Sequence, residues 1–235
     1  MIKTAEISAS DTVLEVGSGR GELTFDLTRH AGRVIAVEKD EKLATRLREE
    51  LRRRQVKNVS VIPGDILKLS SVPNLVRYKA VGNIPYYLTS RLIRILLEDE
   101  PRPEMIVFTV QKEVAQKIVA KPPQMNLLAL SIQAFGRPEI VKTVPASCFS
   151  PRPKVDSAII KISDISDQFF QKNRLDGAEF FEILRRAFSQ KRKLLKNSLS
   201  LNLTRPGLVN IRARPQELSL EQWAKIVTAI TKTRG

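Results

Sequence analysis

The feature that most limits the possible folds is an apolar segment followed at once by a glycine-rich turn. Residues 12–16 predict a buried strand, and Gly17, Gly19 and Gly21 follow at alternate positions. Residues 22–30 then continue with leucines at helical spacing. A strand, a glycine turn and a helix in this order form half of a nucleotide-binding βαβ unit. The dinucleotide pattern GxGxxG is not met, because the third glycine comes one position too early.

Three further apolar segments predict strands that lead to polar groups, at residues 33–37, 59–62 and 78–81. Glu38 directly follows the first of them, where a carboxylate can accept hydrogen bonds from both hydroxyls of a ribose. The alternative role for Glu38 is a helix cap. Asp40 is better placed to cap the next helix, which leaves Glu38 available for a ligand.

Asp65 follows the second of these strands, residues 59–62, in a Pro-Gly-Asp turn. Its carboxylate can accept a hydrogen bond from an adenine amino group, with Ile66 beside the ring, although an isolated turn of this kind is often only a turn. The carboxyl ends of parallel strands line one crevice in a doubly wound sheet. We therefore expect the glycine turn, Glu38, Asp65 and the end of the next strand to lie together.

That next strand ends in Asn83-Ile84-Pro85-Tyr86. Pro85 fixes its own φ and keeps Ile84 extended. The Asn83 carboxamide and the neighbouring carbonyls are then held at the strand end, where they can accept hydrogen bonds from an amino group. Tyr86 can stack on the flat ring that carries this group. The alternative is a proline turn with a solvated asparagine and a core tyrosine.

The remaining strands of the first domain bring the predicted sheet to seven, mostly parallel. They are expected at residues 105–110, 140–144 and 155–162, with the last two paired as a hairpin and with helices at 111–119 and 127–135. Phe149 lies in the loop between the last two strands, which two prolines stiffen. Arg152 and Lys154 flank it, and charge beside this aromatic favours a functional role over a purely structural core position.

Beyond the sheet the chain changes character. Residues 164–177 are polar and predict a linker, and the later segments are helical at 180–188, 191–199 and 220–230. We place an α/β domain at residues 1–165 and a small all-helical domain at 166–235. The second domain carries a basic cluster, consisting of Arg185, Arg186, Lys191, Arg192, Lys193 and Lys196. Such charges repel along a helix unless a polyanion neutralises them, which favours phosphate contact over a solvated face.

Charge and composition narrow the class of protein further. Lys and Arg number 40 against 25 Asp and Glu, a net charge of +15, which predicts a nucleic-acid partner rather than an anionic membrane. One cysteine, Cys148, and one histidine, His30, argue against a disulfide framework and a metal site. No apolar segment approaches a membrane span and no signal pattern opens the chain, so a soluble, cytoplasmic protein is expected.

Several of these motifs together resemble one family. Glu15-x-Gly17-x-Gly19-x-Gly21 is the pattern usual for S-adenosylmethionine-dependent methyltransferases. It is followed in order by Glu38, Gly64-Asp65, Asn83-Ile84-Pro85-Tyr86 and Phe149-x-Pro151-x-Pro153-x-Val155-x-Ser157. With residues 187–193 and 213–218, the chain from about residue 7 to 230 resembles the ribosomal RNA adenine dimethyltransferases of the KsgA type.

The resemblance implies a Rossmann-like methyltransferase domain, a helical RNA-binding domain and two methyl transfers to the exocyclic amino group of adenines in small-subunit rRNA, in ribosome biogenesis. It implies a catalytic set of Asn83, Ile84, Pro85, Tyr86 and Phe149. S-adenosylmethionine is expected at Glu15, Gly17, Gly19, Gly21, Glu38, Lys39, Asp65, Ile66 and Asn83. RNA is expected at Arg152, Lys154 and the basic cluster. We expect a monomer with no metal and no membrane partner.

Two alternatives remain open within this interpretation. An Erm-type methyltransferase of large-subunit rRNA shares much of the pattern, and an RNA-binding assembly factor with weak or no catalysis could use the same fold. Family members usually carry an N-terminal Gly-Gln-His/Asn-Phe-Leu motif that helps to cover the cofactor. This chain begins at Met1-Ile2-Lys3, near the end of the helix that follows the motif, so the contacts of that Gln and Phe are not expected. A DNA adenine methyltransferase is disfavoured, because those commonly carry Asp-Pro-Pro-Tyr or Asn-Pro-Pro-Tyr at this site.

Overall fold

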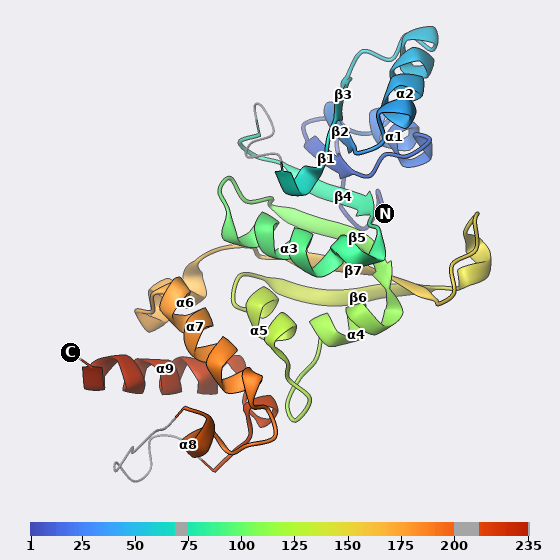
Figure 1. Cartoon of the computed structure of the whole chain (residues 1–235). Coiled ribbons are helices and arrows are strands. Elements are labelled where there is room, and N and C mark those ends of the chain that lie inside the picture. Colours follow the sequence, from blue (N-terminus) through green and yellow to red (C-terminus); the bar gives the residue numbers. More distant parts are fainter. Residues whose placement is uncertain (69–74, 200–211, 235) are drawn as a thin grey trace. The chain divides into compact units, whose positions relative to one another are not determined.

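The computed structural model describes residues 1–68, 75–199 and 212–234 of the chain (Figure 1). It divides into two compact units. Unit 1 comprises Met1–Ala115 and Arg137–Ile165, and unit 2 comprises Gln116–Gly136 and Ser166–Gly235. One of the boundaries between the two units lies after Ile165. Residues 116–136 differ, because the sequence analysis placed them in the first domain and the structure places them in the second unit.

Unit 1 is built on a seven-stranded sheet with the order β3-β2-β1-β4-β5-β7-β6. Its strands are β1 (Thr12–Val16), β2 (Arg33–Glu38), β3 (Val59–Pro63), β4 (Lys79–Asn83), β5 (Met105–Gln111), β6 (Arg137–Val144) and β7 (Ser157–Ser163). β1 to β5 pair in parallel, whereas β7 pairs antiparallel with both β5 and β6. This confirms the mostly parallel seven-stranded sheet and its terminal hairpin. The strand order reverses direction at β1, which is where sheets of this type bind ligands.

The helices are α1 (Glu22–Thr28), α2 (Glu41–Arg53), α3 (Thr89–Glu98), α4 (Lys112–Ile118), α5 (Leu127–Gln133), α6 (Gln168–Asn173), α7 (Gly177–Ser189), α8 (Leu195–Ser198) and α9 (Leu220–Arg234). Short 3-10 turns lie at η1 (Ile66–Lys68), η2 (Tyr86–Leu88), η3 (Ala146–Cys148) and η4 (Pro215–Glu217). Within the described ranges, no helix combines the length and the apolar character that crossing a bilayer would require.

The pleat of the sheet decides which strand residues share a face. Glu15 of β1 is in register with Ala36 of β2 and Val81 of β4. Side chains alternate between faces along a strand, so Glu15, Glu38 and Asn83 all belong to one face, at the carboxyl ends of their strands. On the same face, buried valines of the central strands pack with Leu27 of α1 and Ala5. The polar site is therefore continuous with an apolar core.

Unit 2 has a cluster of phenylalanines that the sequence analysis did not anticipate. Phe170 of α6 is buried and lies between 5.1 and 5.8 Å, centroid to centroid, from Phe135, Phe169, Phe180 and Phe181. The predicted linker at 164–177 is thus wrong in part, because α6 folds to bury this aromatic ring. Phe135 lies two residues after the end of α5, which explains why residues 116–136 join unit 2.

The helix expected at 191–199 is also shorter in the structure. α7 continues to Ser189, residues 191–193 form a turn, and α8 spans only Leu195–Ser198.

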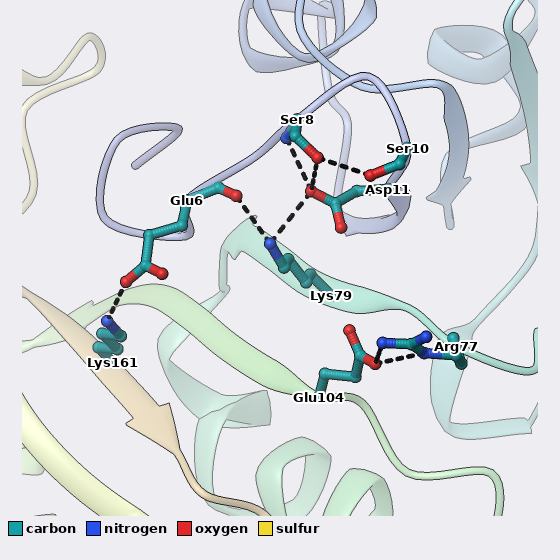
Figure 2. Close-up of polar contacts among 8 residues, drawn as sticks. All are labelled: Glu6, Ser8, Ser10, Asp11, Arg77, Lys79, Glu104 and Lys161. Atoms are coloured by element: carbon teal, nitrogen blue, oxygen red, sulfur yellow. Dashed lines mark hydrogen bonds and ion pairs between the residues drawn. The ribbon is translucent and has the colours of Figure 1, made fainter.

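The first eleven residues are tied to the sheet by two lysines (Figure 2). Lys79 of β4 donates to the Glu6 carbonyl at 2.7 Å and pairs with Asp11 at 3.1 Å. Lys161 of β7 pairs with the Glu6 carboxylate at 2.8 Å. Burial acts to raise the pKa of Asp11, but hydrogen bonds from Ser8 and Lys79 outweigh it and hold the pKa below its usual value. The ionised Asp11 is therefore a stabilising partner.

We predict that Lys79→Met lowers the free energy of unfolding by about 1–3 kcal/mol at neutral pH, because it leaves a partly buried carboxylate without its cation. A carboxyl with a depressed native pKa stabilises above its unfolded pKa and loses that contribution in acid. The difference from the parent chain should therefore shrink below about pH 3.8. Urea unfolding at several pH values measures this.

Arg77→Met is the matched control, because the Arg77–Glu104 pair is more exposed, with side-chain exposures of 83% and 39% (Figure 2). Exposed pairs contribute less than about 1 kcal/mol. Equal losses for the two variants would contradict the role given to Lys79.

Candidate active site

The turn between β1 and α1 has a backbone that favours glycine. The φ angle is +74° at Gly17, +55° at Gly19 and +88° at Gly21, a region that other residues rarely adopt. A Cβ atom at Gly21 would also collide with Leu47 of α2. The Gly21 amide donates to the Ser18 carbonyl at 2.8 Å, which closes the turn. The positive φ angles of the turn and the close approach of Leu47 therefore account for the glycine pattern.

Glu38 joins this turn to the next two elements. One carboxylate oxygen accepts the Gly19 N–H at 2.7 Å and the other accepts the Asp40 N–H at 2.9 Å. The Glu38 carbonyl accepts the Gly64 N–H at 2.8 Å. Each carboxylate oxygen keeps a second lone pair for a further donor. The residue therefore fits the ribose diol of a nucleoside cofactor as the sequence predicts, while Asp40 caps α2 through the Lys42 and Leu43 amides.

Glu15, on β1, is almost completely buried, with 1% of its surface exposed. Its carboxylate accepts a hydrogen bond from the Thr24 hydroxyl at 2.6 Å. Burial raises the pKa of Glu15 to about 7, Thr24 acts against this rise and the nearby charge of Glu38 adds to it. The predicted cofactor residue Glu15 is thus a supporting group whose contact in the structure is with α1.

Asp65 is positioned by its own turn. One oxygen accepts the Leu67 N–H at 3.1 Å, and the other pairs with Lys39 at 3.1 Å. The Leu67 hydrogen bond and Lys39 together hold the pKa of Asp65 below its usual value. Asp65 is therefore ionised at neutral pH and can accept a hydrogen bond from an amino group. Ile66, expected beside such a ring, is half-buried at the start of η1.

The glycine turn passes directly beside Asn83. A Cβ atom at Gly17 would lie 3.7 Å from the Asn83 carbonyl oxygen, and the Gly17 amide donates to Val37 at the end of β2 at 2.9 Å. The Asn83 side chain is exposed. In the described part of the chain, no hydrogen bond occupies its carboxamide. The predicted cofactor crevice and the predicted target site therefore meet at these two strand ends.

The turn after Asn83 holds its shape through its backbone. The Ile84 amide donates to Thr109 of β5 at 3.1 Å, and the Pro85 carbonyl accepts the Leu88 amide at 2.9 Å. Pro85 has φ −53° and ψ 129°. One lone pair of the Pro85 carbonyl is thus already used, which leaves Asn83 and Ile84 as the less encumbered acceptors for a target amino group.

Two aromatic residues are candidates for contact with the target base, Tyr86 in η2 after β4 and Phe149 in the loop between β6 and β7. Tyr86 is half-buried, and its hydroxyl lies 3.0 Å from the Ser157 hydroxyl. Phe149 is half-buried directly after η3. Arg152 and Lys154, in the same loop, are exposed.

The basic cluster of the C-terminal segment belongs to unit 2. All six of its side chains are exposed, on α7, in the following turn and on α8. Within the described ranges, none of these six side chains takes part in an ion pair, so their charge is not neutralised there. Their role in RNA binding stays a prediction.

Sequence reasoning missed two residues that support the site, Thr24 and Ser157. Thr24 is completely buried against Glu15, nine positions away, and no periodicity identifies it. Ser157 is part of the motif that begins at Phe149, so its place in the pattern was visible. Its partner, Tyr86, is 71 positions away and is apparent only from the fold.

The strand order and the glycine turn define a Rossmann-like methyltransferase, and solved structures agree. The crystal structure of a dimethyladenosine transferase from Plasmodium falciparum is 27% identical with a TM-score of 0.85, covering 99% of this chain and 94% of that one. That of the 23S rRNA methyltransferase ErmE is 28% identical with a TM-score of 0.78, covering 97% and 94%.

Sequence comparison identifies the family within this class. The ribosomal RNA adenine dimethylase model matches residues 1–232. The ribosomal RNA small subunit methyltransferase A of Dehalococcoides mccartyi is 39% identical over 246 residues, covering 99% of this chain and 83% of the relative. The chain belongs to the ribosomal RNA adenine dimethylase family.

We predict that Glu15 makes the stability of unit 1 decrease from weakly acidic to weakly basic pH. Its pKa is about 7 in the folded chain against an ordinary value of 4.5, so the folded state holds the extra proton between these values. Stability is then highest below pH 4.5 for this group and falls as pH rises through 7. The full effect is about 3 kcal/mol.

Glu15→Gln cannot ionise and should remove this dependence while keeping an acceptor for Thr24. Urea unfolding of both chains between pH 5 and pH 8 provides the comparison. Parallel pH profiles would show that Glu15 is already ionised at pH 5.

Proposed function

We propose that the chain uses S-adenosylmethionine to transfer two methyl groups to the exocyclic amino group of adenines in small-subunit rRNA, and that it acts in ribosome biogenesis. The approach of Gly17 to the Asn83 carbonyl carries this proposal, because it joins a nucleoside-binding turn to an exposed carboxamide. The name of the Dehalococcoides relative supports the choice of rRNA. We place this activity in the cytoplasm and expect the chain to act as a monomer.

The cofactor residues fit a nucleoside with a charged tail. Glu38 offers its remaining lone pairs to the ribose hydroxyls, and Asp65 offers an ionised oxygen to the adenine amino group. The Ser18 hydroxyl, in the glycine turn, is buried with no hydrogen-bond partner among the described residues, so a polar ligand there would satisfy it. S-adenosylmethionine supplies the electrophilic methyl group.

The target residues address the weak nucleophilicity of an adenine amino group, whose lone pair is delocalised into the ring. The side-chain carbonyl of Asn83 and the backbone carbonyl of Ile84 accept hydrogen bonds from this amino group. These bonds favour a tetrahedral nitrogen, which exposes the lone pair. No strong base is needed before transfer. When the nitrogen–methyl bond forms, the sulfur–methyl bond of the cofactor would break and leave a neutral thioether, and the methylated nitrogen would then release its proton to water. The contribution of these residues is positioning and electrostatic stabilisation.

The adenine must leave its stack to reach these groups. Tyr86 and Phe149 offer rings for the extruded base, and stacking contributes about 1–3 kcal/mol per base. Arg152 and Lys154 lie in the Phe149 loop and can contact neighbouring phosphates. The exposed basic cluster of unit 2 supplies further phosphate contacts.

Methylation of large-subunit rRNA is the second candidate, since the ErmE structure covers nearly the whole chain with a TM-score of 0.78. The higher identity to a small-subunit enzyme, 39% against 28%, favours the first. Mass spectrometry of adenines from both ribosomal subunits after incubation with the chain separates the two. Product confined to the large subunit would overturn the small-subunit assignment.

We predict that Asn83→Ala lowers the rate of methyl transfer at least about a hundredfold, because it removes an acceptor that acts on the reacting nitrogen. The affinity for S-adenosylmethionine should change little, since Glu38 and Asp65 hold the nucleoside. Single-turnover methylation and calorimetry measure the two quantities. An equal loss of both would assign Asn83 to cofactor binding alone.

We further predict that replacing Lys191, Arg192 and Lys193 by Gln makes the dependence of RNA affinity on salt less steep. Each lost phosphate contact removes a little under one unit of the log–log slope, so a change of about 2 to 3 is expected. Binding assays at several salt concentrations give this slope.

The control replaces three exposed cations of unit 1, Arg46, Arg52 and Lys57, and changes the net charge equally. An identical change of slope would mean that total charge, and not the cluster, determines binding.

A further inference from the structure

The Tyr86 hydroxyl has one partner in the described structure, the Ser157 hydroxyl at 3.0 Å. Ser157 is completely buried, with 0% of its surface exposed. It is the first residue of β7 and follows directly on the loop that carries Phe149. A buried hydroxyl needs a hydrogen-bond partner, so this pair fixes the outer end of the Tyr86 ring.

The residue before Ser157 closes the Phe149 loop. One carboxylate oxygen of Asp156 accepts the Ala146 N–H at 3.0 Å, which joins the end of the loop to its beginning. The Asp156 carbonyl accepts the Lys112 N–H at 3.0 Å, directly after β5. Ser157 itself is in register with Gln111 of β5 and Val144 of β6. The dipeptide Asp156-Ser157 is thus attached to three neighbouring segments.

We infer that Ser157 is a positioning residue for methyl transfer: it sets the orientation of the Tyr86 ring, and with Asp156 it couples that ring to the Phe149 loop. The inference rests on the proposed function. Ser157 is buried and acts through Tyr86. It makes the ring that receives the target base depend on the same dipeptide that closes the Phe149 loop.

The second methyl transfer should depend on this coupling more than the first. An unmodified adenine amino group has two hydrogens to donate to the acceptors at Asn83 and Ile84. After one transfer it has a single hydrogen and a methyl group. Hydrogen bonding then holds the group less well, and stacking on Tyr86 contributes a larger share of its orientation. A loosened Tyr86 ring should therefore release monomethylated adenine.

The test uses the full chain with small ribosomal subunits and compares Ser157→Ala with the parent. We expect kcat/KM to fall between about tenfold and a hundredfold, and the ratio of monomethyl- to dimethyladenine to rise several-fold at equal turnover. Tyr86→Phe should give the same product ratio, and the double variant should be no worse than either single one. Ser157→Thr retains the hydroxyl and should restore dimethylation.

Ser163→Ala is the matched control, because Ser163 is at the other end of the same strand. Purely structural damage by Ser157→Ala would lower the amount of folded enzyme and leave the product ratio per turnover unchanged. That outcome, or additive effects of the Ser157 and Tyr86 variants, would overturn the inference.

Hydrogen exchange gives a readout that does not require catalysis. Ser157→Ala should speed exchange both at residues 84–88 and in the Phe149 loop, whereas Ser163→Ala should leave both segments unchanged. Faster exchange near residue 157 alone would overturn the coupling. A parent chain that incorporates no methyl group would instead refute the proposed function, and the exchange pattern would still decide whether Ser157 holds Tyr86.

Discussion

The site depends on the hydrogen bonds that Glu38 accepts. Its two oxygens bond the Gly19 and Asp40 amides, and its carbonyl bonds the Gly64 amide. One residue therefore fixes the glycine turn, the start of α2 and the turn after β3. With 8% exposure, Glu38 is shielded from water, so these hydrogen bonds are stronger than they would be at an exposed position. These bonds hold the glycine turn, the start of α2 and the turn after β3 in fixed positions relative to Glu38.

The charge of Glu38 also affects the pKa of the neighbouring Glu15. Glu15 is buried close to Glu38, and burial together with that charge raises its pKa to about 7. Near neutral pH, the buried carboxyl of Glu15 is therefore only partly ionised, and it lies close to the Glu38 carboxylate that backbone amides hold. Perturbed groups of this kind gather at functional sites, because the arrangement that suits a ligand is not the one that maximises stability.

Much of the site was predictable from the sequence because parallel strands place their carboxyl ends along one edge. This rule alone brings Glu38, Asp65 and Asn83 together once the strands are recognised. Contacts between side chains of distant residues were not predictable, since the bonds of Ser157 to Tyr86 and of Thr24 to Glu15 depend on packing. Unit 2 departed most from expectation, because buried phenylalanines of α6 and the end of α5 overrode a polar-linker pattern and a domain boundary drawn by chain order.

The two halves of the site differ in how they are held. The cofactor half is fixed by backbone amides bonded to carboxylates, and the positive φ angles of its glycines restrict replacement there. The target half relies on a proline, an exposed carboxamide and one bond between two hydroxyls. Substitutions in the first half should therefore disturb folding and cofactor binding together. Those in the second half can change how the base is presented while the sheet remains intact, because Asn83 and Ser157 pair with their neighbouring strands through the backbone.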